Sequence, residues 1–123
     1  MSERILLLTI SILFLTPLMP MAFAADPIIY ENMRSGRQTV ATAGTAVQLS
    51  SASVVTKKTI ICAEDDNTGT IAVGSTNVSA ALSTRNGIYL LTADCAVISV
   101  NDLNKIYLDS TINGDGVTYA YFF

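Results

Sequence analysis

Two kinds of side chain in this sequence could do chemistry: a pair of cysteines and a group of oxygen donors near the C-terminus. Cys62 and Cys95 are the only cysteines, and the chain contains no histidine. Two thiols without a histidine make an incomplete zinc site. In a small exported domain a disulfide is the favoured prediction, and two separate buried thiols are the alternative.

The oxygen donors lie in residues 109–116, where Asp109, Asn113 and Asp115 could converge on a hard cation such as calcium. The segment starts like an EF-hand loop, but its twelfth position is Ala120, where that loop needs a bidentate glutamate. It also runs directly into a predicted strand. We therefore predict a hairpin turn in which one of the two glycines supplies a positive φ angle, and no metal site.

No other set of residues indicates a reaction. The lack of histidine removes the side chain most used as a general base near neutral pH, and with it any Ser-His pair. Ser-Lys chemistry would have to use Lys57 or Lys58, and no partner serine is marked. We expect a protein that is not an enzyme and that needs no cofactor.

The charge of the chain argues against nucleic acid as a partner. The formal net charge is −3 at neutral pH. Phosphate binding requires a clustered positive surface, and the basic residues of the body are scattered instead. They are Arg34, Arg37, Lys57, Lys58, Arg85 and Lys105.

Residues 1–24 have the three parts of a secretory signal peptide. A short charged start is followed by an apolar run at residues 5–15 and by the exit motif Ala-Phe-Ala at residues 22–24. Cleavage there would leave about 99 residues, exported and without a stable membrane span. The alternatives are an internal start at Met19 or Met21, a retained apolar arm, and a true membrane anchor, for which the run is too short.

The remainder reads as short strands separated by turn residues. β-branched and aromatic residues fill the segments, Gly, Asn and Asp punctuate them, and no segment keeps a helical period for a dozen residues. This pattern predicts one all-β domain at residues 37–123, a small antiparallel β-sandwich or barrel of jelly-roll or immunoglobulin-like type. The predicted strands are residues 37–41, 46–49, 58–64, 70–73, 76–79, 88–91, 96–100, 105–108 and 117–122.

Residues 25–36, between leader and domain, look like an extended N-terminal arm. Pro27 restricts the residue before it to extended conformations. The arm is more apolar than a free tail needs to be. We predict that its apolar side chains contact a neighbouring subunit, and the alternative is that the arm packs across its own domain. These side chains are Ile28, Ile29, Tyr30 and Met33.

The C-terminus is aromatic. Tyr121, Phe122 and Phe123 end the last predicted strand, and tyrosine and phenylalanine are favoured in subunit interfaces. We predict that these three residues contribute to an interface, and the alternative is that they fill the domain's own core.

Four stretches are considered together: RQTVATAGTAVQL at residues 37–49, NTGTIAVG at 67–74, VNDLNKIYLD at 100–109 and NGDGVTY at 113–119. They resemble the small β-rich accessory proteins of tailed-bacteriophage virions. The resemblance implies a structural role as a capsid decoration or head-fibre protein, a capsid or self-assembly partner, a homo-oligomer, and location in the virion. It supplies no catalytic residues. Cys62 and Cys95 replace residues expected to be polar and outward, which implies a cross-strand bridge on the surface.

Overall fold

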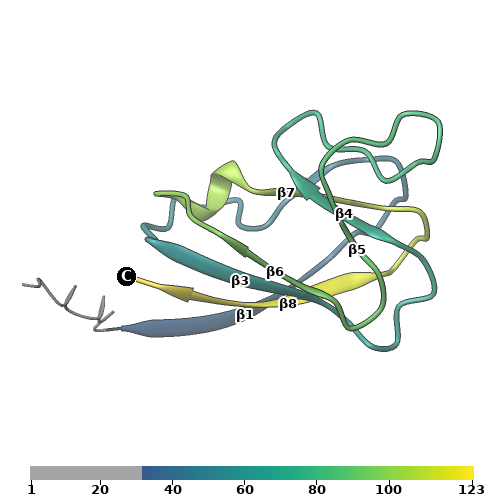
Figure 1. The fold of residues 1–123 in the computed structure, drawn as a ribbon. Coiled ribbons are helices and arrows are strands. Elements are labelled where there is room, and N and C mark those ends of the chain that lie inside the picture. The colour runs from purple at the N-terminus through teal and green to yellow at the C-terminus, as the bar shows by residue number, and fades with distance from the viewer. Residues whose placement is uncertain (1–31) are drawn as a thin grey trace, which may run out of the picture.

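The computed structural model describes residues 32–123, which form two four-stranded antiparallel β-sheets with a shared core between them (Figure 1). Residues 1–31 lie outside the described part, and with them the predicted leader and the arm residues Ile28, Ile29 and Tyr30. The strands are β1 (Met33–Thr39), β2 (Val47–Gln48), β3 (Lys58–Ala63), β4 (Ile71–Gly74), β5 (Ile88–Leu90), β6 (Cys95–Ile98), β7 (Tyr107–Ser110) and β8 (Gly116–Phe122). The prediction of an all-β sandwich is confirmed.

The order of the strands is that of a jelly roll. Sheet A runs β1-β8-β3-β6 and sheet B runs β2-β7-β4-β5. The first strand therefore pairs with the last, the second with the seventh, the third with the sixth and the fourth with the fifth. The chain is one long antiparallel ribbon, closed at the β4–β5 end and wrapped so that successive pairs fall in alternate sheets. Of the two predicted types, this order fits the jelly roll.

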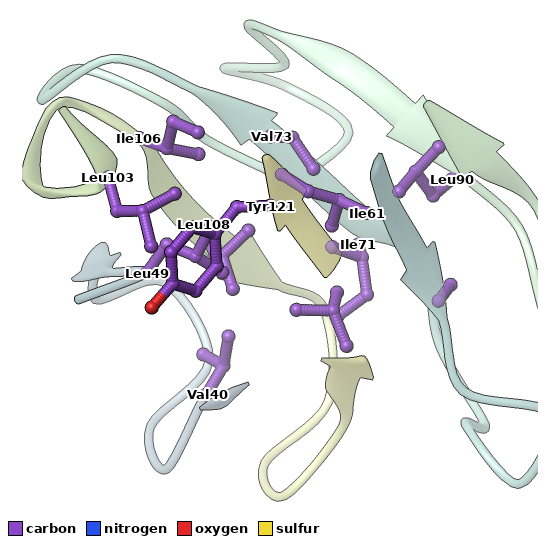
Figure 2. Close-up of a cluster of buried hydrophobic side chains, with 12 residues drawn as sticks. Val40, Leu49, Ile61, Ile71, Val73, Leu90, Leu103, Ile106, Leu108 and Tyr121 are labelled. Carbon is purple, nitrogen blue, oxygen red and sulfur yellow. The ribbon is translucent and has the colours of Figure 1, made fainter. Parts of the chain in front are cut away.

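The core fills the space between the sheets, as Figure 2 shows. In β3 the side chains of Thr59, Ile61 and Ala63 are buried and those between them are partly exposed, which is the period of two expected of a strand with one face on a core. Each fully buried leucine or isoleucine contributes about 1.5–3 kcal/mol. The largest fully buried apolar side chains are Val40, Leu49, Ile61, Ile71, Val73, Leu103, Ile106, Leu108 and Val117.

Strand β1 starts earlier than the sequence predicts. Met33 to Gly36, placed in the arm by the sequence, pair with β8 in the register Met33↔Phe122 to Thr39↔Gly116. Gly36 allows this close approach, because a Cβ there would lie 2.5 Å from the ring of Tyr119. The ring of Tyr119 can therefore lie against the backbone of the edge strand β1 at Gly36.

The strand predicted at residues 76–79 is wrong. This segment belongs to a loop, residues 75–87, in which Val78 N–H donates to the Ser75 carbonyl at 3.0 Å and only an isolated bridge joins Ser79 to Asn86. The hydrogen bonds formed within the loop replace those of a ladder, so local turn chemistry overrides the strand propensity of the residues.

The helical content of residues 32–123 is one short 3₁₀ turn, η1 (Leu103–Lys105). The Asp102 carboxylate caps it by accepting from the Asn104 N–H at 3.0 Å, and Leu103 anchors it in the core. No helix in this part of the chain has the length and apolar character needed to cross a membrane.

Candidate functional site

A disulfide joins the two cysteines, as predicted. Cys62 on β3 stands directly opposite Cys95 on β6, with their Cα atoms 4.0 Å apart. Both side chains point away from the core, because their neighbours Ile61 and Ala96 face it. The bridge therefore lies on the outward surface of sheet A.

The outward surface of sheet A is formed by strands β1, β8, β3 and β6. All four strands contribute alternate side chains to it, set side by side by the printed register. We call it the outer face of sheet A, formed by Met33, Ser35, Arg37, Lys58, Ile60, Cys62, Cys95, Val97, Thr118, Ala120 and Phe122.

This face is apolar at its centre and charged only at its ends. Ile60 lies between Ala120 of β8 and Val97 of β6, and Val97 is 58% exposed. Lys58 stands at one end and Arg37 at the other. An antiparallel sheet with a solvated face normally alternates apolar and polar residues, so this composition is typical of a covered face.

Two open hollows are set into the outer face of sheet A. One, of about 550 Å³, is lined by residues of the central strands that include Ile60 and Ala120. The other, of about 490 Å³, lies toward the acidic turn at residues 64–66. Arg37, Cys62 and Thr118 line both. Both hollows are shallow and widely open to solvent.

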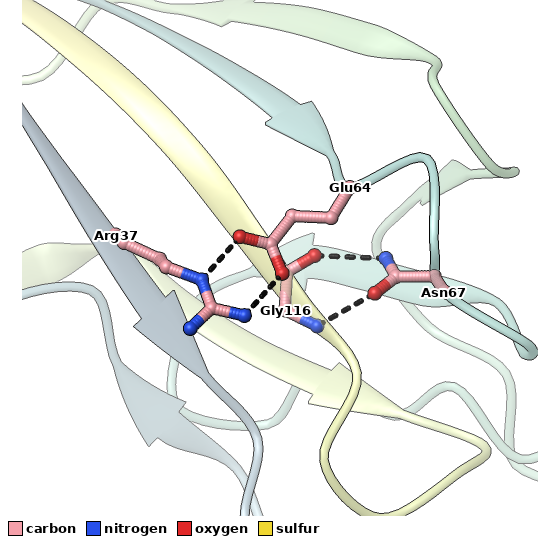
Figure 3. Close-up of polar contacts among 4 residues, drawn as sticks. All are labelled: Arg37, Glu64, Asn67 and Gly116. Atoms are coloured by element: carbon pink, nitrogen blue, oxygen red, sulfur yellow. Dashed lines mark hydrogen bonds and ion pairs between the residues drawn. The ribbon is translucent and has the colours of Figure 1, made fainter.

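An ion pair closes the Arg37 end of this face (Figure 3). Arg37 donates through both Nε and a terminal nitrogen to the two oxygens of Glu64, the latter contact at 2.7 Å. Behind it, the Asn67 amide donates to the Gly116 carbonyl and accepts from the Gly116 N–H, each at 2.8 Å. The side chain of Asn67 thereby continues the hydrogen bonding of β8 where β3 has ended.

The ion pair changes the pKa of both Arg37 and Glu64. The hydrogen bond from Arg37 lowers the pKa of Glu64 below its usual value, and the same contact raises the pKa of Arg37. Both groups therefore stay charged at neutral pH. Arg37 keeps 60% of its side chain exposed and Glu64 only 10%, so the guanidinium is the member that presents itself to solvent.

The outward surface of sheet B is covered by the chain itself. Ala72 on β4 points outward yet is fully buried, because loop 75–87 places Val78 and Ala80 over it. The Tyr89 hydroxyl holds the loop by donating to the Ser79 carbonyl at 3.3 Å. One sheet thus carries its own cover, and the other has none within residues 32–123.

The carboxylate of Asp109 holds loop 75–87 in place through a hydrogen bond from Ala80. Its side chain is 1% exposed and accepts from the Gly44 N–H at 2.9 Å and from the Ala80 N–H at 2.8 Å. Gly44 and Ala80 belong to two separate loops. The carboxylate that the sequence offered as a calcium ligand is therefore engaged with backbone amides.

The other two oxygen donors are also engaged with backbone amides. Asp115, 6% exposed, accepts from the N–H groups of Thr68 and Gly69 at 3.1 and 2.7 Å, and Asn113 accepts from the Ala43 N–H at 2.7 Å. Among residues 32–123 no three His, Cys, Asp or Glu side chains are grouped as a metal site requires.

The turn predicted around residues 109–116 exists, but it is not a hairpin. Gly114 supplies the positive φ, at 88°. The turn joins β7 of sheet B to β8 of sheet A, and these strands do not pair with each other. The wrapped ribbon requires this crossing between sheets, which turn residues alone do not indicate.

The described residues that were predicted to contact partners lie in two different places in the structure. Met33, 63% exposed, and Phe122 lie opposite each other on the outer face of sheet A. Tyr121 is 9% exposed and belongs to the core, and Phe123 packs against that core beneath the Arg34 guanidinium. Tyr121 therefore lies in the domain's own core and Phe123 packs against it.

Sequence reasoning did not single out Ile60, Val97 and Ala120, the centre of this face. The signal was present in KTIICA and CAVI, the sequences of β3 and β6, where apolar residues follow one another without alternation. Such runs indicate a strand that is apolar on both faces.

No protein-family model matches this chain, and no curated protein is significantly similar to it.

Proposed function

We propose that the protein is a non-enzymatic structural protein that acts by assembling with other protein subunits, as an accessory component of a virion of the capsid-decoration or head-fibre type. The observation that carries the proposal is the apolar centre of the outer face of sheet A, where Ile60 lies beside Val97, which is 58% exposed. Surface patches of this kind mark protein-protein contact sites.

Two further observations support the virion role. The stretches at residues 37–49 and 100–109 resemble those of tailed-phage accessory proteins. The jelly-roll strand order is the architecture of many viral capsid domains, although it also serves lectins and cupins, so this support is an analogy of fold.

Peptide mass spectrometry of purified virus particles tests this role. Particles from the source culture, treated with nuclease and banded by density, should contain peptides of residues 58–105 in a fixed ratio to the major capsid protein. Recovery of the protein only in the cell-envelope or secreted fraction would contradict the virion role.

A second function, an exported cell-surface or secreted β-sandwich that binds a protein or a glycan, is favoured by the Cys62–Cys95 disulfide. Disulfides persist in oxidising compartments. The intact mass of the native protein separates the two cases. A chain that begins at Ala25 and is lighter by two hydrogens supports export, whereas a chain retaining residues 1–24 argues against it.

A further inference from the structure

Two Asn-Gly pairs, Asn86-Gly87 and Asn113-Gly114, lie in the described chain. In such a pair the backbone nitrogen of the glycine can attack the side-chain carbonyl carbon of the asparagine, because glycine has no side chain to obstruct the approach. The side-chain carbon–nitrogen bond then breaks, ammonia leaves with the amide proton of the glycine, and a succinimide ring remains. Water opens the ring to aspartate or to isoaspartate, so the reaction needs no co-reactant other than water.

The pair Asn113-Gly114 is protected by the fold. The side-chain oxygen of Asn113 accepts from the Ala43 N–H at 2.7 Å. The attacking nitrogen, that of Gly114, donates to the Val40 carbonyl at 2.8 Å. Both hydrogen bonds must break before the carboxamide can turn onto the Gly114 nitrogen.

The pair Asn86-Gly87 lacks this protection. Both residues are exposed at the end of loop 75–87. The Asn86 carboxamide makes one hydrogen bond, from Nδ2 to the Asn77 carbonyl at 3.2 Å. The Gly87 N–H donates to no group among residues 32–123. The attacking nitrogen is therefore available, and the leaving nitrogen gives up a single contact.

The fold also requires the glycine of this pair. Gly87 has a φ of 117°, and a Cβ there would lie 2.7 Å from the Val73 carbonyl oxygen. A side chain at position 87 is therefore excluded. The chain thus keeps after Asn86 the residue that hinders the attack least.

Asn86 closes the loop that covers sheet B. Its backbone exchanges two hydrogen bonds with Ser79, at 2.9 and 3.1 Å, and its side chain holds the Asn77 carbonyl. Ser79 lies between the two loop residues that cover Ala72. A chemical change at Asn86 therefore acts on the cover of sheet B.

We propose that Asn86 is a site of spontaneous deamidation, and that the product loosens loop 75–87 over the outward surface of sheet B. Aspartate places a carboxylate against the Asn77 carbonyl where the amide donor stood. Isoaspartate adds a carbon to the backbone at the bridge to Ser79. The change is one-way, because ammonia is lost to the solvent, and it does not depend on the proposed assembly function.

Peptide mass spectrometry of the full chain, held folded at mildly alkaline pH, measures the reaction at both pairs in one sample. Trypsin separates them, because Asn86 falls in peptide 86–105 and Asn113 in peptide 106–123. Conversion should be at least about tenfold faster at Asn86, since two hydrogen bonds must break before Asn113 reacts.

The same measurement in urea is the control for local sequence. With the fold removed, the two rates should become similar. Equal rates in the folded chain, or faster conversion of Asn113, would overturn the inference. A difference that persists unchanged in urea would assign it to local sequence and would also contradict the role given to the fold.

Proteolysis tests the loosening of the loop. Leu82 is 80% exposed in loop 75–87 and offers chymotrypsin a site there. The deamidated fraction, separated from aged protein by its extra negative charge, should be cut after Leu82 about fivefold faster than fresh protein, the effect of losing one hydrogen bond. Equal cutting of the two fractions would contradict the loosening.

Asn86→Gln is the matched variant. It keeps the amide, and its longer side chain closes the ring far more slowly. Aged Asn86→Gln should be cut after Leu82 as slowly as fresh Asn86→Gln. An equal rise in cutting of the aged variant and the aged wild type would show that another change loosens the loop, which would rule out Asn86 as the site.

Discussion

The outward surfaces of the two sheets are built on similar strands but differ in how far their outward-pointing residues are buried. On sheet B, Ala72 points outward and is completely buried beneath Val78 and Ala80. On sheet A, Ala120 also points outward from a central strand and stays partly exposed beside Ile60. A loop covers the outward surface of sheet B, whereas no loop among residues 32–123 covers the apolar outward surface of sheet A.

The difference shows two uses of an apolar sheet surface. A face covered by its own loop contributes to the stability of the single domain, because its apolar area is removed from water on folding. A face without such a cover among residues 32–123 contributes in this way only when other residues cover it. Substitutions on the two faces should therefore change different measurable quantities.

The largest effect should come from placing the same charge on each face. Ala72→Lys must bury an ammonium group or expel the covering loop, and should lower the free energy of unfolding by about 4 kcal/mol or more. Ala120→Lys should change it by less than about 0.5 kcal/mol, measured by urea denaturation at protein concentrations too low for association.

The threonine variants at the same two positions keep this comparison measurable if Ala72→Lys does not fold. Equal losses of stability at the two positions would show that sheet A is also covered within one molecule, and would contradict the distinction between the faces.

Removing the disulfide should have the next largest effect. Cys62 and Cys95 are separated by 33 positions, and closing a loop of that size is worth about 3–4 kcal/mol in the chain-entropy model. The double variant Cys62→Ser/Cys95→Ser should unfold at correspondingly lower denaturant concentration. The monomer of this variant should lose stability even though the bridge lies on the outer face of sheet A. The stabilisation by the disulfide would then be independent of whether that face is covered.

Asp109→Ala should be nearly as damaging. It leaves the buried N–H group of Ala80 without its acceptor and removes one of the two acceptors of the Gly44 N–H, at a cost of about 1–3 kcal/mol. Asp65→Asn, an exposed carboxylate in the acidic turn, is the matched control and should be neutral. Proteolysis should cut loop 75–87 faster in Asp109→Ala, and unchanged cutting would show that the carboxylate does not hold the cover in place.

The smallest effect concerns the Arg37–Glu64 pair. The pKa of Glu64 is lowered in the folded chain, so its contribution to stability is present above the unfolded value, about 4.5, and is lost as the pH falls through the folded value. The stability difference between wild type and Glu64→Gln should therefore shrink as the pH is lowered below about 4.5. A difference that stays constant over this range would contradict a role for the ionised pair.

The sequence predicts more of the fold than of the candidate site. Strands such as β3 and β8 are marked by β-branched and aromatic residues, and the turn at Gly114 by its flanking Asn and Asp, because these signals are local. The pairing of Cys62 with Cys95 follows from there being only two thiols in a chain without histidine.

The remaining features depend on long-range arrangement. The local sequence does not predict the exposure of Ile60, because an apolar residue in a strand gives the same sequence pattern whether or not another segment covers it. Asp109 offers the same oxygens to a cation as to the amides of Gly44 and Ala80, and the wrapping of the ribbon decides which of them it meets.

The pairing of the first described strand with the last determines how the domain would respond to force. Asn32 and Phe123 are joined at one end of sheet A, so a pull between them opens β1 from β8 like a zipper, one pair of hydrogen bonds at a time. Shearing would load all seven residue pairs together. A component held by this end would yield in small steps, while the Cys62–Cys95 bridge keeps the inner half of the ribbon closed under tension.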